Sequence, residues 1–189
     1  MHTDRSTGNP VSSIRTRTFA LIAGTVLSVS ACASSDAVRE GTALRATGPQ
    51  AVGVLGFPRA QVGKSYRFAF PPFVNGTGTK LVVESVKLTQ VPKGARVIGY
   101  PVYSVDETDG YMLDSQVGLK YPRDMTKVPD HAGKPITVEP HKKSDFYAMV
   151  EVHVTGQVQH HLGGCQITYT QKGRKYRQTL RCDFALDMK

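Results

Sequence analysis

Residues 145–155 read DFYAMVEVHVT, and this stretch decides the fold. Its side chains alternate with a period of two, as they do along a β-strand. One face carries the apolar residues Phe146, Ala148, Val150, Val152 and Val154. The other face carries Tyr147, Met149, Glu151 and His153. This pattern predicts a strand that buries the first face in a core and leaves the second face to the solvent.

The same period continues on both sides of this stretch. Tyr66, Phe68 and Phe70 share one face of a run that Pro71 and Pro72 end. In the β-rich run 80–91, the residues expected on one face are Val82, Val86 and Leu88. No segment keeps a helical period over three turns, so we expect strands throughout the region.

Seven or eight short strands, separated by turns rich in Gly, Pro and Asn, predict an all-β fold. We expect an immunoglobulin-like β-sandwich, and a small β-barrel with the same strand count is the alternative. With 189 residues, the chain is long enough for a single domain of this kind.

An apolar segment near the N-terminus has the features of a secretory signal. Residues 19–29, FALIAGTVLSV, carry no charge, follow Arg15 and Arg17, and lead into small residues. Eleven apolar residues are too few to span a bilayer as a permanent helix.

The four residues that end this segment, Val29-Ser30-Ala31-Cys32, resemble the lipobox of bacterial lipoprotein precursors. The resemblance covers the leader only. It implies that Cys32 takes a diacylglycerol and that residues 1–31 are removed as a signal peptide. The protein would then be lipid-anchored to the cell membrane of a bacterium, outside the cytoplasm. The alternative is ordinary signal cleavage, which also fits Ala31-Cys32-Ala33 and would discard the thiol.

Lipidation of Cys32 also accounts for an odd number of cysteines in an exported chain. It leaves Cys165 and Cys182, and an oxidising compartment favours a disulfide between them.

The stretch CQITYTQKGRKYRQTLRCDFAL, which contains both of these cysteines, predicts a hairpin. A type II′ turn at Gly173-Arg174 sets Cys165 opposite Cys182. A turn at Lys172-Gly173 sets Cys165 opposite Leu180 instead. The disulfide favours the first register, or a wider loop centred on it.

From these features we expect three parts: a signal peptide (1–31), a lipid-anchored flexible tether (32–63) and an immunoglobulin-like sandwich domain (64–189). The alternative for part of the tether is that the apolar piece AVGVLGF docks on the domain as an edge strand. The formal charge of +9 falls only to +7 when residues 1–31 are removed, because they carry three arginines and one aspartate. This positive charge favours contact with anionic surfaces.

By alternation, Lys175, Arg177 and Arg181 fall on the outer face of the predicted hairpin. We interpret them as a candidate binding patch for the membrane surface, an anionic envelope polymer or another envelope protein. The alternative is a solvated face whose charges discourage edge-to-edge aggregation. Nucleic acid is not an expected partner of an exported protein, and this face has no interleaved aromatic residues.

The sequence predicts no catalytic, cofactor or metal site. It has no GxSxG, HExxH or GxxxxGK[ST] motif. His160 and His161 are adjacent and would face opposite ways on a strand, and the acidic loop 106–114 lacks the final bidentate carboxylate of a calcium loop. We expect a non-enzymatic binding module at the cell envelope. The alternative function is a small-ligand or metal-handling envelope lipoprotein.

Overall fold

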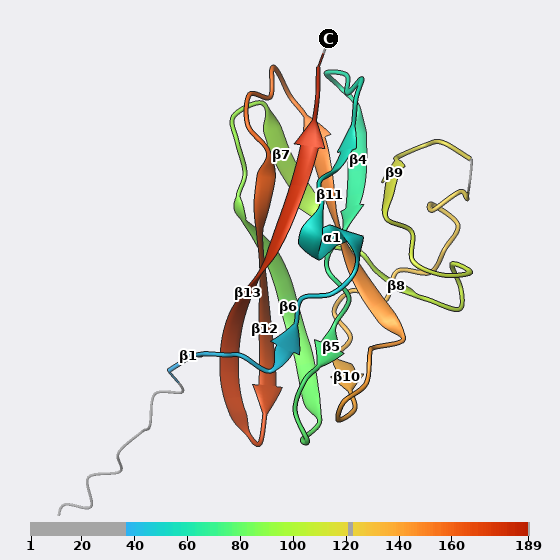
Figure 1. Cartoon of the computed structure of the whole chain (residues 1–189). Helices are drawn as coiled ribbons and strands as arrows, with labels where there is room; N and C mark the ends of the chain where they lie inside the picture. The colour runs from blue at the N-terminus through green and yellow to red at the C-terminus, as the bar shows by residue number, and fades with distance from the viewer. Residues whose placement is uncertain (1–36, 121–122, 189) are drawn as a thin grey trace, which may run out of the picture. The chain divides into compact units, whose positions relative to one another are not determined.

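The computed structural model describes residues 37–120 and 123–188. The predicted leader and Cys32 lie outside these residues. Two β-sheets pack face to face, and neither closes into a barrel within the described ranges, so the predicted all-β sandwich is confirmed (Figure 1).

The first sheet has six strands. They are β1 (Arg39–Glu40), β3 (Leu55–Phe57), β6 (Leu81–Gln90), β10 (Ile136–Val138), β12 (Leu162–Gln171) and β13 (Arg174–Leu186). The second sheet has five, which are β4 (Ser65–Ala69), β7 (Ala95–Gly99), β8 (Val102–Ser104), β9 (Asp114–Gln116) and β11 (Phe146–Val154). A separate pair is formed by β2 (Leu44–Arg45) and β5 (Val74–Asn75), and one short helix, α1, spans Pro49–Val52.

The order of the central strands is that of the immunoglobulin fold. Strands β13-β12-β6 correspond to G-F-C of one immunoglobulin sheet, and β7-β11-β4 correspond to D-E-B of the other. The short strand β3 runs parallel to β13, beside the first sheet. Cys165 and Cys182 form a disulfide, as predicted, but it joins neighbouring strands β12 and β13 and not the two sheets.

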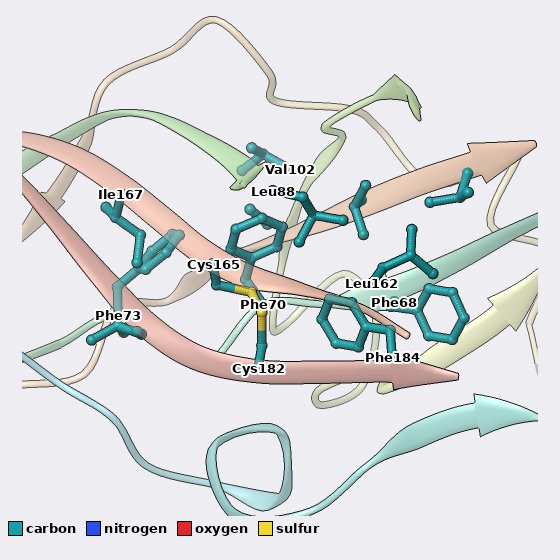
Figure 2. Packing of buried hydrophobic residues seen from close by; sticks show 14 of the residues in the cluster. Phe68, Phe70, Phe73, Leu88, Val102, Leu162, Cys165, Ile167, Cys182 and Phe184 are labelled. Carbon is teal, nitrogen blue, oxygen red and sulfur yellow. A yellow bond between two sulfur atoms is a disulfide. The ribbon is translucent and has the colours of Figure 1, made fainter. Parts of the chain in front are cut away.

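The core between the sheets is built from the alternating apolar faces. Tyr66, Phe68 and Phe70 are all buried there, as the sequence predicts. The ring of Phe68 stacks on that of Phe184 from the opposite sheet, with centroids 5.0 Å apart (Figure 2). Both cysteines belong to the same buried cluster.

The prediction that β11 has one solvent-facing side is wrong for half of that side. Tyr147 and Met149 are buried, because the long connection between β7 and β11 folds over the outer face of the sheet. This connection contributes Tyr103 and Met125 to a second apolar cluster around them. Only the end of the strand that carries Glu151 and His153 keeps polar side chains on this face.

The hairpin register favoured from the sequence is also wrong. The turn is Lys172-Gly173, with φ angles of 50° and 69°, and Cys165 lies opposite Leu180. Positive φ at both central residues is what a type I′ turn requires. The disulfide still forms because a bulge at Gly164 places two residues of β13 against one of β12, which brings Cys182 within a Cα–Cα distance of 5.8 Å from Cys165.

The predicted core face of β6 is wrong at its first residue, Val82, because β6 contains a second bulge. The pairing with β12 shifts at Glu84, so Val83 points into the core and Val82 does not. Beyond the bulge, Val86 and Leu88 return to the core side, as predicted.

The prediction of a flexible tether over 32–63 is wrong for its described part, residues 37–63. The backbone N–H of Ala43 donates to the hydroxyl of buried Tyr169 at 3.1 Å. The side-chain amide of Gln178 accepts from the N–H of Leu44 at 3.0 Å and donates to its carbonyl at 2.7 Å. The alternative that the apolar piece docks as an edge strand agrees with β3.

We predict that Gly164→Ala strongly destabilises the domain. Gly164 has a φ of 69°, and an added Cβ would lie 2.0 Å from the hydroxyl oxygen of Thr89. We expect the free energy of unfolding, measured in urea, to fall by roughly 2–5 kcal/mol from backbone strain and overpacking together. The control is Gly173→Ala, which has the same φ but open space around it, and should cost only about 1–2 kcal/mol. Equal losses in the two variants would contradict this role of the bulge.

Candidate functional site

The predicted basic patch lies where the sequence placed it. Lys175, Arg177 and Arg181 are all exposed on β13, and their neighbours Tyr176, Leu180 and Cys182 pack on the core side. Thr170 and Thr168 of β12 stand opposite Lys175 and Arg177 in the ladder. The patch therefore occupies the outer face of the first sheet, on the side away from the second sheet.

One of the three cations is neutralised by a carboxylate. The ammonium of Lys175 lies 2.9 Å from Glu84, which also accepts a hydrogen bond from the Thr170 hydroxyl. These two partners, Thr170 first, lower the pKa of the Glu84 carboxyl. Arg177 and Arg181 have no carboxylate of the described residues within 4 Å.

Sequence reasoning missed a third free cation of this face. Lys87 of β6 is exposed and stands opposite Gln166, which in turn stands opposite Thr179 between the two arginines. Its place on the outer face follows from the same alternation that puts Val86 and Leu88 on the core side. We use the name "basic face" below for Arg177, Arg181 and Lys87 with the Thr and Gln side chains between them.

A second candidate lies on the outer face of the other sheet. There, the connection between β7 and β11 borders a hollow of about 520 Å³. Its polar lining residues include Arg67, Tyr103, Asp130 and Glu151. None of these residues was singled out from the sequence as a site residue, because all four are far apart along the chain and no motif links them.

Arg67 and Glu151 form the polar floor of this hollow. They are cross-strand partners on β4 and β11. Glu151 Oε2 accepts a hydrogen bond from Arg67 Nε at 2.9 Å and lies 2.8 Å from Arg67 Nη2 in the same ion pair. Their side chains are only 11% and 18% exposed. The remaining nitrogen, Nη1, is buried without a hydrogen-bond partner among the described residues, as is the hydroxyl of Ser115 on the neighbouring strand.

Buried Tyr103 and exposed Asp130 complete the polar lining. The guanidinium of Arg67 lies over the Tyr103 ring, 5.9 Å from its centroid. Burial raises the pKa of Tyr103 to about 12, so its hydroxyl keeps its proton at neutral pH. Asp130 Oδ1 accepts from the backbone N–H groups of Val102 and Ala132 at 2.9 and 2.8 Å, which fixes this carboxylate in place.

The described residues hold no cluster of three or more His, Cys, Asp or Glu that could bind a metal ion. His160 is exposed and His161 is 2.6 Å from Asp183. Two carboxylates of the acidic loop are paired with side chains of the same connection, Glu107 with His131 and Asp109 with Arg123.

A serine and a histidine are also in contact, with Ser65 Oγ and His153 Nδ1 3.0 Å apart. Nucleophilic catalysis of the serine type also needs a third group that orients the histidine. Within residues 37–120 and 123–188, no carboxylate is hydrogen-bonded to His153.

No protein-family model matches this chain, and no curated protein or solved structure matches it either.

Among the described residues, no helix has both the length and the apolar character needed to cross a membrane.

We predict that stability falls above pH 10 because of Tyr103. The unfolded chain loses the phenol proton near its ordinary pKa of 10.0, whereas the folded protein keeps it until about pH 12. The unfolded state therefore gains stability as the pH rises through this window, and the free energy of unfolding falls by up to about 2 kcal/mol. Urea unfolding at several alkaline pH values measures this loss. Tyr103→Phe should make the fall shallower, and an unchanged slope would contradict the prediction.

Proposed function

We propose that this protein is a bacterial lipoprotein, anchored through Cys32 outside the cytoplasm, whose sandwich domain is a non-enzymatic binding module of the cell envelope. The observation that carries the binding role is the pair of exposed arginines, Arg177 and Arg181, without carboxylate partners among the described residues. The lipobox-like sequence at Cys32 supports the anchor.

The Cys165–Cys182 disulfide supports a location outside the cytoplasm. Disulfides persist in oxidising compartments and are rare where glutathione and thioredoxin keep thiols reduced. An envelope location also decides which anions the protein meets, since nucleic acid is confined to the cytoplasm.

The basic face suits a flat, anionic partner. The three cations of the basic face, Arg177, Arg181 and Lys87, are separated by hydroxyl and amide side chains that donate and accept hydrogen bonds. An anionic envelope polymer or an acidic envelope protein fits this surface, and the negatively charged membrane surface adds to the attraction.

The second candidate function is that of an envelope lipoprotein that binds a small ligand. The hollow at Arg67 and Glu151 favours this alternative, because concave sites with a few fixed polar groups are typical of ligand binding.

We predict that Arg177→Glu with Arg181→Glu abolishes partner binding and leaves the fold intact. A photo-crosslinkable residue at Thr179, between the two arginines, should capture the partner in living cells, and the double variant should lose this capture. Binding to the isolated partner should fall more than tenfold, because each charge near an anionic surface contributes about 1 kcal/mol.

The matched control is Lys93→Glu with Arg96→Glu, which makes the same charge change at exposed positions beside the other sheet. If the two double variants bind equally, the basic face is not the site. A midpoint of urea unfolding similar to that of the unsubstituted protein checks that each variant is folded.

We predict that Cys32→Ser releases the protein from the membrane fraction. Mass spectrometry of the unsubstituted protein should find an N-terminal Cys32 with a diacylglycerol on its thiol. A mature N-terminus after Cys32 would show ordinary signal cleavage and contradict the anchor.

A further inference from the structure

We propose that the hollow on the outer face of β4, β7 and β11 binds a neutral saccharide. This site lies on the sheet opposite the basic face and does not depend on it. It rests on the second candidate function above, for which it names the class of ligand.

The hollow presents hydrogen-bond acceptors more than donors, because the unpaired nitrogen of Arg67, Nη1, is itself buried. Glu151 uses only Oε2 to bind Arg67, and Asp130 uses only Oδ1 to bind the backbone. No hydrogen bond from the described residues reaches the other oxygen of either carboxylate. The Tyr103 hydroxyl adds one group that both donates and accepts. Sugar hydroxyls are donors and acceptors at once, so they can satisfy this mixed set.

Charge argues against an anionic ligand. Two carboxylates and one guanidinium line the hollow, and the guanidinium is already engaged by Glu151. An anion would meet the unused oxygens of Glu151 and Asp130 and be repelled. An organic cation would instead have to approach Arg67, which makes a neutral ligand the better match.

The ion pair between Arg67 and Glu151 fixes the position of the Glu151 carboxylate, which is one of the acceptors of the hollow. A largely buried ion pair contributes little net stability, because desolvation of the two charges offsets their attraction. Arg67 holds one oxygen of Glu151 through a hydrogen bond from Nε and an ion pair with Nη2, while its guanidinium lies over the Tyr103 ring, so the carboxylate keeps a single orientation. Preorganised polar groups lower the cost of binding a ligand.

Apolar side chains complete the wall of the hollow. Ile98 is 50% exposed, and Tyr100, Met125 and Val128 lie nearby in the lining. The Tyr100 ring itself packs against the core between the sheets, where the N–H of Leu88 donates to its hydroxyl at 3.0 Å and the ring of Phe70 lies edge-on to it. Exposed apolar side chains beside polar acceptors suit a sugar ring, whose C–H groups form an apolar face and whose hydroxyls lie at the edge.

The test is a titration followed by two-dimensional NMR of backbone amides. The protein is the full chain carrying Cys32→Ser, produced by secretion so that the disulfide forms. The probes are trisaccharides of glucose, mannose, galactose and N-acetylglucosamine, with spermidine as a cationic probe. We expect saturable shifts from at least one trisaccharide, centred on residues 98–103 and 125–132, and none there from spermidine.

Two conservative variants and one control make the result specific. Asp130→Asn and Tyr103→Phe should each weaken saccharide binding about fivefold, the effect of one lost hydrogen bond. The control, Asp106→Asn, changes an exposed aspartate of the same connection outside the hollow and should bind as the parent chain does. Asp130 is exposed and Tyr103→Phe keeps the ring, so neither variant removes a core contact.

The proposal is overturned if no trisaccharide shifts these amides, if only spermidine does, or if the three variants bind alike. The double variant Arg177→Glu with Arg181→Glu should retain saccharide binding. If this variant loses partner capture but still binds the saccharide, the two sites are separate. Failure of the basic-face proposal would show in the crosslinking, and failure of the saccharide proposal would show in the titration.

Discussion

The contact on which the rest of the structure depends is the stacking of Phe68 on Phe184 between the two sheets. Both rings are fully buried, and Phe57 of β3 packs edge-on against Phe68 at 5.6 Å between centroids. One aromatic cluster thus joins β4, β13 and the edge strand β3. Burial of large side chains contributes about 2–3 kcal/mol each, and the disulfide beside them adds about 3 kcal/mol by limiting the unfolded chain. Because these core contacts hold the two sheets together, the residues on the outer faces of the sheets can differ without changing the fold.

They do differ, because the connection between β7 and β11 covers only the second sheet. Tyr147 and Met149 are buried beneath it, and the hollow opens where its cover ends near Glu151. None of the described residues covers Arg177 and Arg181 on the first sheet, which presents a polar surface there. The protein thereby combines a flat basic face with a concave, acceptor-rich one, and each suits a different class of ligand.

The two candidate sites differ in how far they could be predicted. Alternation along one strand was enough to place Arg177 and Arg181 outside, because the buried neighbours in the same strand fix its orientation. Lys87 also falls outside by alternation, since Val86 and Leu88 on either side of it face the core, but only the structure shows that its strand lies beside β12 and so joins the same face as the two arginines. The hollow was not predictable at all, because Arg67, Tyr103, Asp130 and Glu151 meet only after β4, β11 and the connection have packed together.

By itself, the sequence determined the fold class and the exposure of Arg177 and Arg181, because both follow from a period of two, which is a local property. The Cys165–Cys182 pair was predicted from the cysteine count together with the lipobox resemblance, which sets Cys32 aside. Only the tertiary structure decided the hairpin register, the docking of residues 37–63 and the burial of Tyr147 and Met149. A bulge of one residue hardly changes the alternation of apolar and polar residues, so the sequence pattern does not reveal it. The docking of residues 37–63 depends on which surfaces remain uncovered after the sheets have packed.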